Sequence, residues 1–208
     1  GLGDVYKRQD LMNEKAEKLG MKNTHFSNAH GLWAQQNYSS CKDMATLCEY
    51  AISKYQVFRD IVCLPSYHMA STSYHSDGTD IYNTNLMLDS MTDYYYSYAK
   101  GIKTGTLDSA GRCLASYAEY EGTTYLIVTM GAPMDKLEED VKKGEEDPDS
   151  IYGGDNVYYN LLDHINLYKW AFSSLVATDF VDKNSEIRDV KVSLSLIHIS
   201  EPTRRVVI

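Results

Sequence analysis

The chain has 208 residues and a formal net charge of −9, and 43% of its residues are hydrophobic against 24% that are charged. This composition is typical of a globular protein with one sizeable core. The acidic balance gives no basic footprint for nucleic acid, and no stretch approaches the roughly 18 apolar residues of a membrane span.

The two ends of the chain are related through DNA. The codons GAT GTG TAT AAG AGA CAG encode residues 4–9, and their reverse complement, CTG TCT CTT ATA CAC ATC, encodes residues 194–199. This DNA resembles the transposon end used in sequencing libraries, and residues 200–204 resemble the adapter that follows it. We therefore expect residues 1–9 and 194–208 to be adapter-derived and the chain to be a piece of a longer protein. Natural terminal extensions are the alternative.

Helices are expected first along the remaining chain. Residues 11–19 have an amphipathic pattern that Gly20 would end. A loop over residues 22–38 leads to Ser40, and the apolar spacing after it predicts a second helix. Ser40 and Asp43 have the spacing of a capping pair.

Strands are expected next. Residues 67–85 have an alternating pattern rich in aromatic residues, Thr and Ser, which suggests a hairpin or an extended excursion. Residues 101–106, 113–118 and 124–130 have strand character, and the last two are separated by Glu121-Gly122. Such short links predict an antiparallel meander.

The last part of the chain turns acidic over residues 135–155, where we expect a solvated, mobile insertion. Oxygen ligands for calcium are plentiful there, but the spacing of an EF-hand loop is absent. Residues 157–175 predict a long amphipathic helix. Residues 187–192 suggest a strand, and residues 181–193 a possible start of a C-terminal β domain.

Lys103-Thr104-Gly105 is the most informative motif. A K-T-G strand in serine acyl-transferases works beside a nucleophilic S-x-x-K and a polar S-x-N loop. Lysine supplies positive charge beside the nucleophile and a substrate carboxylate, threonine offers a hydroxyl, and glycine lets a peptide lie against the backbone. An ordinary surface strand is the alternative interpretation.

Several further segments accompany this motif in a fixed order. They are 12–13, 19–26, 28–32, 38–40 with 43–45, 83–85, 110–111 and 130–133. The series resembles the middle and end of the catalytic domain of D-alanyl-D-alanine carboxypeptidases, the low-molecular-mass penicillin-binding proteins. The resemblance implies an α/β (α+β) fold of the serine β-lactamase/transpeptidase type, an antiparallel sheet packed with helices, incomplete at the N-terminus. Residues 10–180 would be part of the catalytic domain.

The resemblance also implies a function for the parent protein. It would trim peptidoglycan stem peptides ending in D-Ala-D-Ala through an acyl-enzyme, bind β-lactams, need no cofactor or metal, and act at the outer face of the cytoplasmic membrane. Lys103, Thr104, Gly105 and Thr106 would bind substrate, with Lys103 also catalytic and the Thr106 N–H in the oxyanion hole. Any membrane contact would come from other parts of the parent. Two positions depart from the family pattern: Leu107 replaces a usual threonine, and only Lys136 stands where a carboxylate-binding arginine is usual.

The catalytic serine is missing from this pattern. Ser39-Ser40-Cys41-Lys42 fits S-x-x-K, but the family places this segment downstream of its nucleophile, so we interpret it as a helix cap. No S-x-N occurs, and the isolated chain is expected to be inactive. A class A β-lactamase and a non-catalytic peptidoglycan-binding relative are the alternatives.

Other candidate groups receive structural interpretations. His25 and His30 lack a third metal ligand at suitable spacing. Tyr94-Tyr95-Tyr96 could form a carbohydrate platform, but packing before the K-T-G strand is favoured. The four cysteines lack a C-x-x-C pair, and we expect mostly buried thiols.

Overall fold

An antiparallel sheet lies at the centre of the molecule. The computed structural model describes residues 2–147, 149–151 and 156–175. Three strands, β3 (Ala99–Leu107), β4 (Gly111–Tyr120) and β5 (Thr123–Ala132), pair in the order β3-β4-β5. The turn between β4 and β5 has positive φ at Glu121 (47°) and Gly122 (77°), which makes it tight. The expected meander and the fold class are confirmed.

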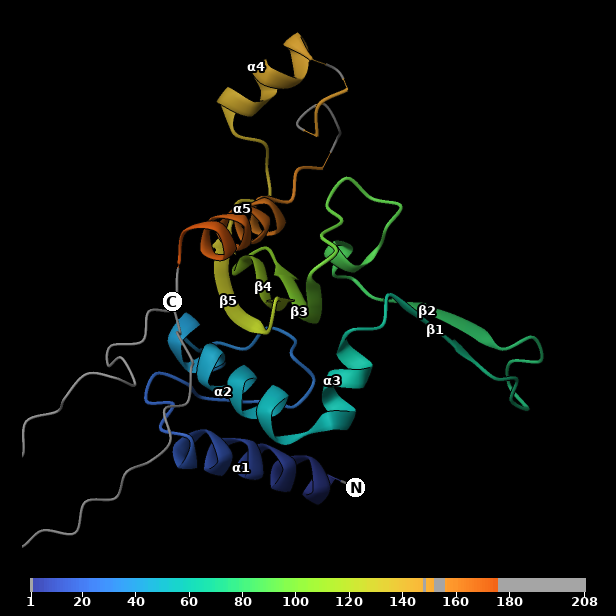
Figure 1. Ribbon diagram of the computed structural model, residues 1–208. Coiled ribbons are helices and arrows are strands. Elements are labelled where there is room, and N and C mark those ends of the chain that lie inside the picture. Colours follow the sequence, from blue (N-terminus) through green and yellow to red (C-terminus); the bar gives the residue numbers. More distant parts are fainter. Residues whose placement is uncertain (1, 148, 152–155, 176–208) are drawn as a thin grey trace, which may run out of the picture.

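Helices cover both faces of this sheet (Figure 1). One face carries α5 (Tyr159–Ser174), and the other carries α2 (Cys41–Lys54) and α3 (Gln56–Val62). The outermost helix, α1 (Leu2–Lys18), lies beyond α2 and contacts it through the Lys15 ammonium, 5.0 Å from the centre of the Tyr50 ring. The sheet is therefore the middle layer of a helix–sheet–helix arrangement.

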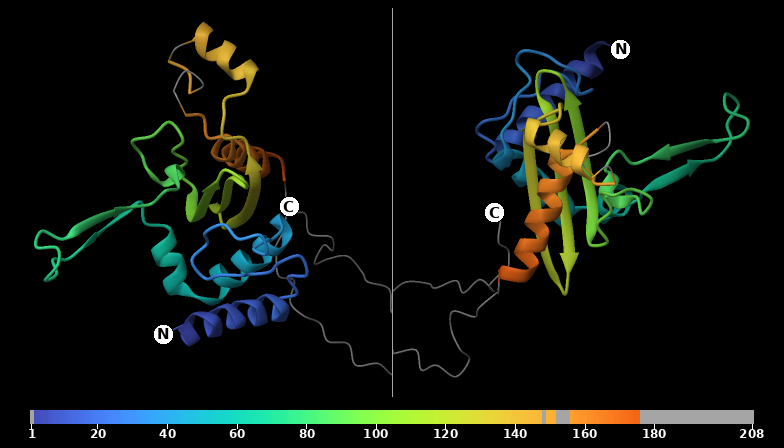
Figure 2. Two further views of the ribbon diagram at one scale, coloured as in Figure 1. Left: turned by 180° about the vertical axis from the view of Figure 1, so that it is seen from behind. Right: turned by 90° about the horizontal axis from the view of Figure 1, so that it is seen from above.

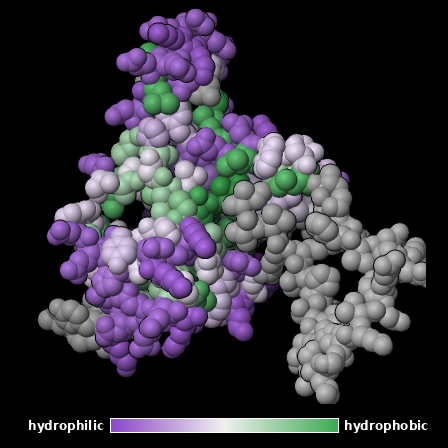
Figure 3. Space-filling view, turned by 90° about the vertical axis from the view of Figure 1, so that its left-hand side faces the viewer, coloured by the Kyte–Doolittle hydropathy of each residue, from purple (hydrophilic) through white to green (hydrophobic). Residues whose placement is uncertain are grey.

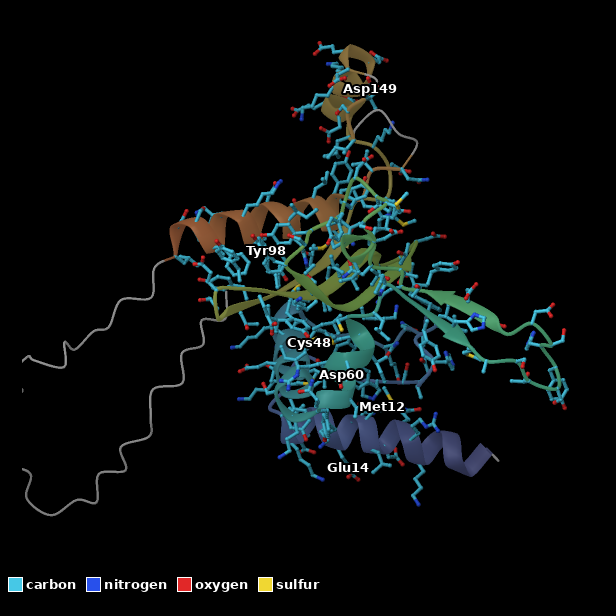
Figure 4. All side chains as sticks on the ribbon, turned by 45° about the vertical axis from the view of Figure 1, so that its right-hand side comes forward. Met12, Glu14, Cys48, Asp60, Tyr98 and Asp149 are labelled. Carbon is cyan, nitrogen blue, oxygen red and sulfur yellow. The ribbon has the colours of Figure 1, made fainter. Side chains whose placement is uncertain are left out.

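β4 is buried from Leu114 to Ala118 and separates two hydrophobic clusters. Figure 4 shows Cys48, which belongs to the cluster on the α2 side, beneath the sheet, and Tyr98 between the sheet and α5. The cluster under α5 comprises Met87, Tyr94, Ala99, Leu114, Ala118, Tyr125, Leu161, Ile165, Tyr168 and Ala171. The cluster on the α2 side comprises Cys48, Ile102, Ala115, Tyr117 and Leu126. Burial on both faces fixes the central strand and, through it, its neighbours.

The tyrosine run before β3 packs as expected rather than forming an open platform. Tyr94 is buried, and Tyr96 stacks at 5.9 Å on the buried ring of Tyr168. Only Tyr95 of the three is exposed. The run therefore joins β3 to α5.

A hairpin projects from this body as an arm (Figure 2). Its strands, β1 (Ser66–Met69) and β2 (Thr79–Tyr82), are antiparallel and exposed along their length. The arm's base is closed by the Asn83 N–H, which donates to the Pro65 carbonyl at 2.8 Å. A short 3₁₀ helix, η1 (Leu86–Leu88), follows. The expected hairpin is confirmed.

Some boundaries differ from the sequence expectations. α1 begins at Leu2 rather than at residue 11, so one helix runs through the expected adapter boundary. Ser40 caps α2 as expected, accepting the Asp43 N–H at 3.2 Å. The acidic insertion contains a helix, α4 (Glu138–Glu146), whose three acidic residues in the first turn suit the positive helix end. This helix within the insertion was not predicted from the sequence.

The cysteine expectation was wrong in part. All four thiols are free, but only Cys48 is buried, while Cys41 is exposed. Burial raises the pKa of the Cys48 thiol to about 11. The expected strand at 187–192, the possible domain at 181–193 and the expected adapter segment 194–208 lie outside the described residues.

One side of the molecule is apolar across its middle (Figure 3). A groove between β5 and α5 is lined by Tyr125, Leu126, Ile127, Leu167, Trp170 and Ala171. Trp170 is 48% exposed there. None of the described helices is long and apolar enough to cross a membrane.

A polar network lies between the sheet and α5. The buried hydroxyl of Ser116 is 2.7 Å from both His164 Nδ1 and the Tyr168 hydroxyl. His164 Nε2 is 2.7 Å from the Thr129 hydroxyl. Both ring nitrogens therefore have partners, and burial lowers the pKa of His164 to about 3. The imidazole is neutral at pH 7.

We expect the protein to lose stability as the pH falls below about 6.5, because an unfolded histidine takes up a proton there and buried His164 does not. Its pKa is about 3 in the fold. The free energy of unfolding should fall by up to about 1.4 kcal/mol per pH unit between those values. Urea titrations across pH 4–8 measure this fall. His164→Gln is the non-titrating comparison, and identical pH dependence in both proteins would refute the assignment.

Candidate active site

The K-T-G motif lies on β3, an edge strand of the described sheet. Across β4, the registered pairs are Lys103 with Ala115, Thr104 with Leu114, Gly105 with Cys113 and Thr106 with Arg112. The outer edge of β3 has no partner strand among the described residues, so its backbone groups are open to an extended ligand.

The Asn83-Thr84-Asn85 segment holds this strand in place. Asn85 is fully buried, and its side-chain N–H donates to the Gly101 carbonyl at 3.2 Å. The Thr84 and Thr104 hydroxyls are hydrogen-bonded to one another. Asn83 reaches back to the carbonyl groups of Val62 and Leu64. One short segment therefore links α3, the base of the arm and the K-T-G strand.

A cleft of about 470 Å³ opens along this strand. Its walls come from β3, β4, the start of η1 with the segment before it, and the start of α5. The lining residues are Thr84, Leu86, Lys103, Thr104, Gly105, Thr106, Arg112, Tyr158, Asn160 and Leu161. All four residues that the sequence predicted as the substrate wall line the same cleft.

The K-T-G side chains suit an anionic peptide ligand. Lys103 is exposed, and its ammonium donates to the Thr104 carbonyl at 2.6 Å. A Cβ added to Gly105 would meet only the Cβ of Cys113, at 3.7 Å, an ordinary contact. Internal packing therefore does not demand glycine at this position, and the missing side chain instead keeps the cleft wall flat.

Arg112 is a cleft residue that the sequence reasoning missed. It is only 7% exposed, and its guanidinium donates to the Val157 carbonyl at 2.7 Å. The guanidinium carbon is 4.0 Å from the centre of the Tyr158 ring. The sequence could have indicated this position, because a short link between the first two strands of the predicted meander sets residue 112 opposite residue 106.

The other sequence candidates lie outside the cleft. Ser39 shares a hydrogen bond of 2.9 Å with the Thr24 hydroxyl, and Ser40 caps α2. His25 Nδ1 is 2.6 Å from the Gln36 carbonyl oxygen, while His30 Nδ1 accepts the Leu32 N–H. These contacts support the loop and cap interpretations. In the described part of the chain, no group of three or more His, Cys, Asp or Glu side chains could hold a metal ion.

Neither of the two residues that depart from the family pattern lines the cleft. Leu107 pairs with Gly111 at the end of β3 and does not line the cleft. Lys136 follows β5 and is also not part of the lining. Arg112 is thus the one arginine of the cleft wall as described.

Comparison with known proteins shows which family the chain belongs to. The family model described as D-alanyl-D-alanine carboxypeptidase matches residues 7–134. The chain belongs to the D-alanyl-D-alanine carboxypeptidase family. D-alanyl-D-alanine carboxypeptidase DacF of Bacillus subtilis is 31% identical over 129 residues, which cover 60% of this chain and 30% of that protein. The chain spans less than half the length of the curated carboxypeptidases it matches.

Solved structures of penicillin-binding proteins share the fold. A mutant of the Streptomyces K15 DD-transpeptidase superposes with a TM-score of 0.62 at 25% identity, covering 81% of this chain and 55% of that one. Cefotaxime-bound penicillin-binding protein D2 of Listeria monocytogenes gives a TM-score of 0.51 at 28% identity, with coverage of 66% and 52%. The three-layer fold is therefore that of the carboxypeptidase and transpeptidase group.

We expect Asn85→Ala to lower the free energy of unfolding by about 1–3 kcal/mol, because it leaves a buried carbonyl without its donor. That carbonyl belongs to Gly101, two residues before Lys103. Urea denaturation measures the loss. The control is Asn166→Ala at an exposed position of α5, which should change stability by less than about 0.5 kcal/mol. Equal effects of the two variants would contradict the role of Asn85.

Proposed function

We propose that this chain is part of a serine-type D-Ala-D-Ala carboxypeptidase that trims peptidoglycan stem peptides. The observation that carries the proposal is the K-T-G strand, which lines an open cleft from an edge position in a chain of this family. A peptide extended along β3 can pair with its backbone, and Lys103 provides positive charge beside the reacting carbonyl and the terminal carboxylate.

The proposed reaction divides its groups between this chain and other parts of the parent protein. A serine on the parent attacks the D-Ala-D-Ala carbonyl, D-alanine leaves, and water hydrolyses the acyl-enzyme. The N–H of Thr106 stabilises the oxyanion together with the N–H of that serine. This chain contributes the wall formed by Lys103, Thr104, Gly105 and Thr106, and we propose that it is inactive alone.

The proposal extends to partners and location. β-Lactams mimic the scissile peptide, and a relative of this fold has been solved with cefotaxime bound. Stem peptides and β-lactams are therefore the ligands we assign to the complete cleft, with the parent at the outer face of the cytoplasmic membrane. Sequence upstream of this chain that carries S-x-x-K and S-x-N supports an active parent, whereas coding sequence that lacks them supports the non-catalytic alternative.

Gly105→Val should weaken peptide binding about tenfold while leaving the unfolding free energy unchanged within about 1 kcal/mol. The new Cβ meets only the Cβ of Cys113, at 3.7 Å, an ordinary contact, whereas the added side chain interrupts the flat cleft wall. Titration of N-acetyl-D-Ala-D-Ala, followed by NMR, measures binding. Ala110→Val adds bulk at an exposed turn outside the cleft and is the matched control. Unchanged affinity in Gly105→Val would remove Gly105 from the substrate wall.

Fluorescent penicillin should not label the isolated chain covalently, because Ser39 and Ser40 are engaged in the Thr24 bond and the α2 cap. Denaturing gel electrophoresis measures the label, with a complete penicillin-binding protein as the positive control. Labelling that disappears in Ser39→Ala would overturn the proposal that the nucleophile lies elsewhere in the parent.

A further inference from the structure

The arm formed by β1 and β2 exposes several large apolar side chains to solvent. They are Tyr67, Met69, Tyr74, Ile81 and Tyr82. Exposed apolar groups that gather on one surface mark an interaction site. Because the arm projects away from the sheet (Figure 2), a large partner can reach it from either side.

Strand pairing sorts the arm's side chains onto two faces. Tyr82 lies opposite Ser66, and Asp80 lies opposite His68. Residues that are directly opposite, or two apart on one strand, share a face. These four residues therefore form one surface, the Tyr82 face, on which the Tyr82 ring is 72% exposed.

The Tyr82 face combines an aromatic ring with a hydrogen-bonding pair. His68 Nδ1 is 2.7 Å from Asp80 Oδ1, and the two side chains are 61% and 59% exposed. A carboxylate can accept on the order of four hydrogen bonds, so Asp80 keeps acceptor capacity for a ligand. A sugar has apolar C–H faces and a rim of hydroxyl groups. An aromatic ring beside accessible acceptors and a serine hydroxyl suits both parts of it.

The charge of the arm separates a neutral sugar from other polymers. Residues 66–82 contain no lysine or arginine, and their carboxylates are Asp77 and Asp80. A surface without cations does not attract phosphate-bearing polymers or anionic lipid. Neutral hydroxyl groups, in contrast, donate to carboxylates without a charge of their own. The arm is therefore suited to a neutral saccharide.

The arm and the cleft are continuous along the chain. Tyr82 precedes the cleft residue Thr84 by two residues, and Asp80 precedes it by four. At about 3.4 Å per residue, these separations are at most about 7 and 14 Å. An extended peptide spans the larger distance with about four residues. A peptide bound along β3 can therefore carry an attached sugar to the Tyr82 face.

We propose that the Tyr82 face of the arm is a docking surface for the neutral, N-acetylated glycan strand to which the stem peptide is attached. This inference rests on the proposed function and deepens it, because the cleft takes the peptide end and the arm takes the sugar chain. The Tyr82 ring stacks on a sugar C–H face, and Asp80 accepts hydrogen bonds from its hydroxyl groups. The arm thereby favours peptides that are still attached to glycan over free peptides.

The test titrates the full 208-residue chain with the tetramer of β-1,4-linked N-acetylglucosamine, followed by NMR. We expect resonances of residues 66–82 to shift. Tyr82→Ala should lower the affinity about tenfold, whereas Tyr82→Phe keeps the ring and should stay within about threefold. Tyr95→Ala is the matched control, because it removes an exposed tyrosine outside the arm, and it should keep the full affinity.

A parallel titration with N-acetyl-D-Ala-D-Ala reports on the cleft and separates the two proposals. If the dipeptide binds and the tetramer does not, only the docking surface is overturned. If the tetramer shifts the arm and the dipeptide does not bind, the proposed function fails and the sugar-binding surface stands. If neither binds, both fail.

Two further results would refute the docking surface. One is a tetramer affinity that is equal in Tyr82→Ala and the unsubstituted chain. The other is a set of arm resonances that shift with protein concentration in the absence of sugar, together with a dimer in sedimentation, because a second copy would then be the occupant. Should Tyr82→Ala disrupt the pairing of β1 with β2, Tyr82→Thr decides by the same tenfold criterion, since threonine favours strands and lacks the ring.

Discussion

The structure depends on the burial of β4 on both faces. Leu114 and Ala118 pack under α5, while Ala115 and Tyr117 pack on the α2 side. A central strand covered in this way has no freedom to slip, because a shift by one residue would exchange the two sets of side chains. The K-T-G wall of the cleft is held in the same register, since each K-T-G residue pairs with a residue of β4.

The α5 side of β4 is not uniformly apolar, and its polar part specifies how the helix docks. Ser116 can meet His164 and Tyr168 together only when α5 lies at one rotation and one height. Apolar packing alone tolerates small displacements, whereas a buried hydrogen-bond network with an unpaired member is costly. The same docking sets Asn160 and Tyr158, near the start of α5, against the cleft. A structural network that does not line the cleft thereby fixes a wall of the site.

Local sequence patterns predicted much of the fold. The meander, the capped second helix and the long last helix follow from alternation, capping chemistry and amphipathic spacing, and the K-T-G strand was located to within two residues. α1 extends beyond its expected start because residues 1–9 were set aside as adapter-derived. The α4 helix was not anticipated because Val141 is its one apolar residue, so it has no apolar stripe. The cleft beyond the motif was out of reach for another reason. The short link between β3 and β4 indicates that Arg112 lies opposite Thr106. Tyr158 and Asn160 reach the same cleft only after α5 docks, and no short-range pattern records that event.

The exposed arm of β1 and β2 is mechanically connected to the cleft. Its base is pinned at Asn83, and the next residue shares a hydrogen bond with the K-T-G threonine. The base of the arm is therefore connected to Thr104 by one hydrogen bond from the neighbouring residue, Thr84. A force on the tip of the arm would be transmitted through Asn83 to the hydrogen bond between Thr84 and Thr104, so the position of the arm and the alignment of the K-T-G strand are linked.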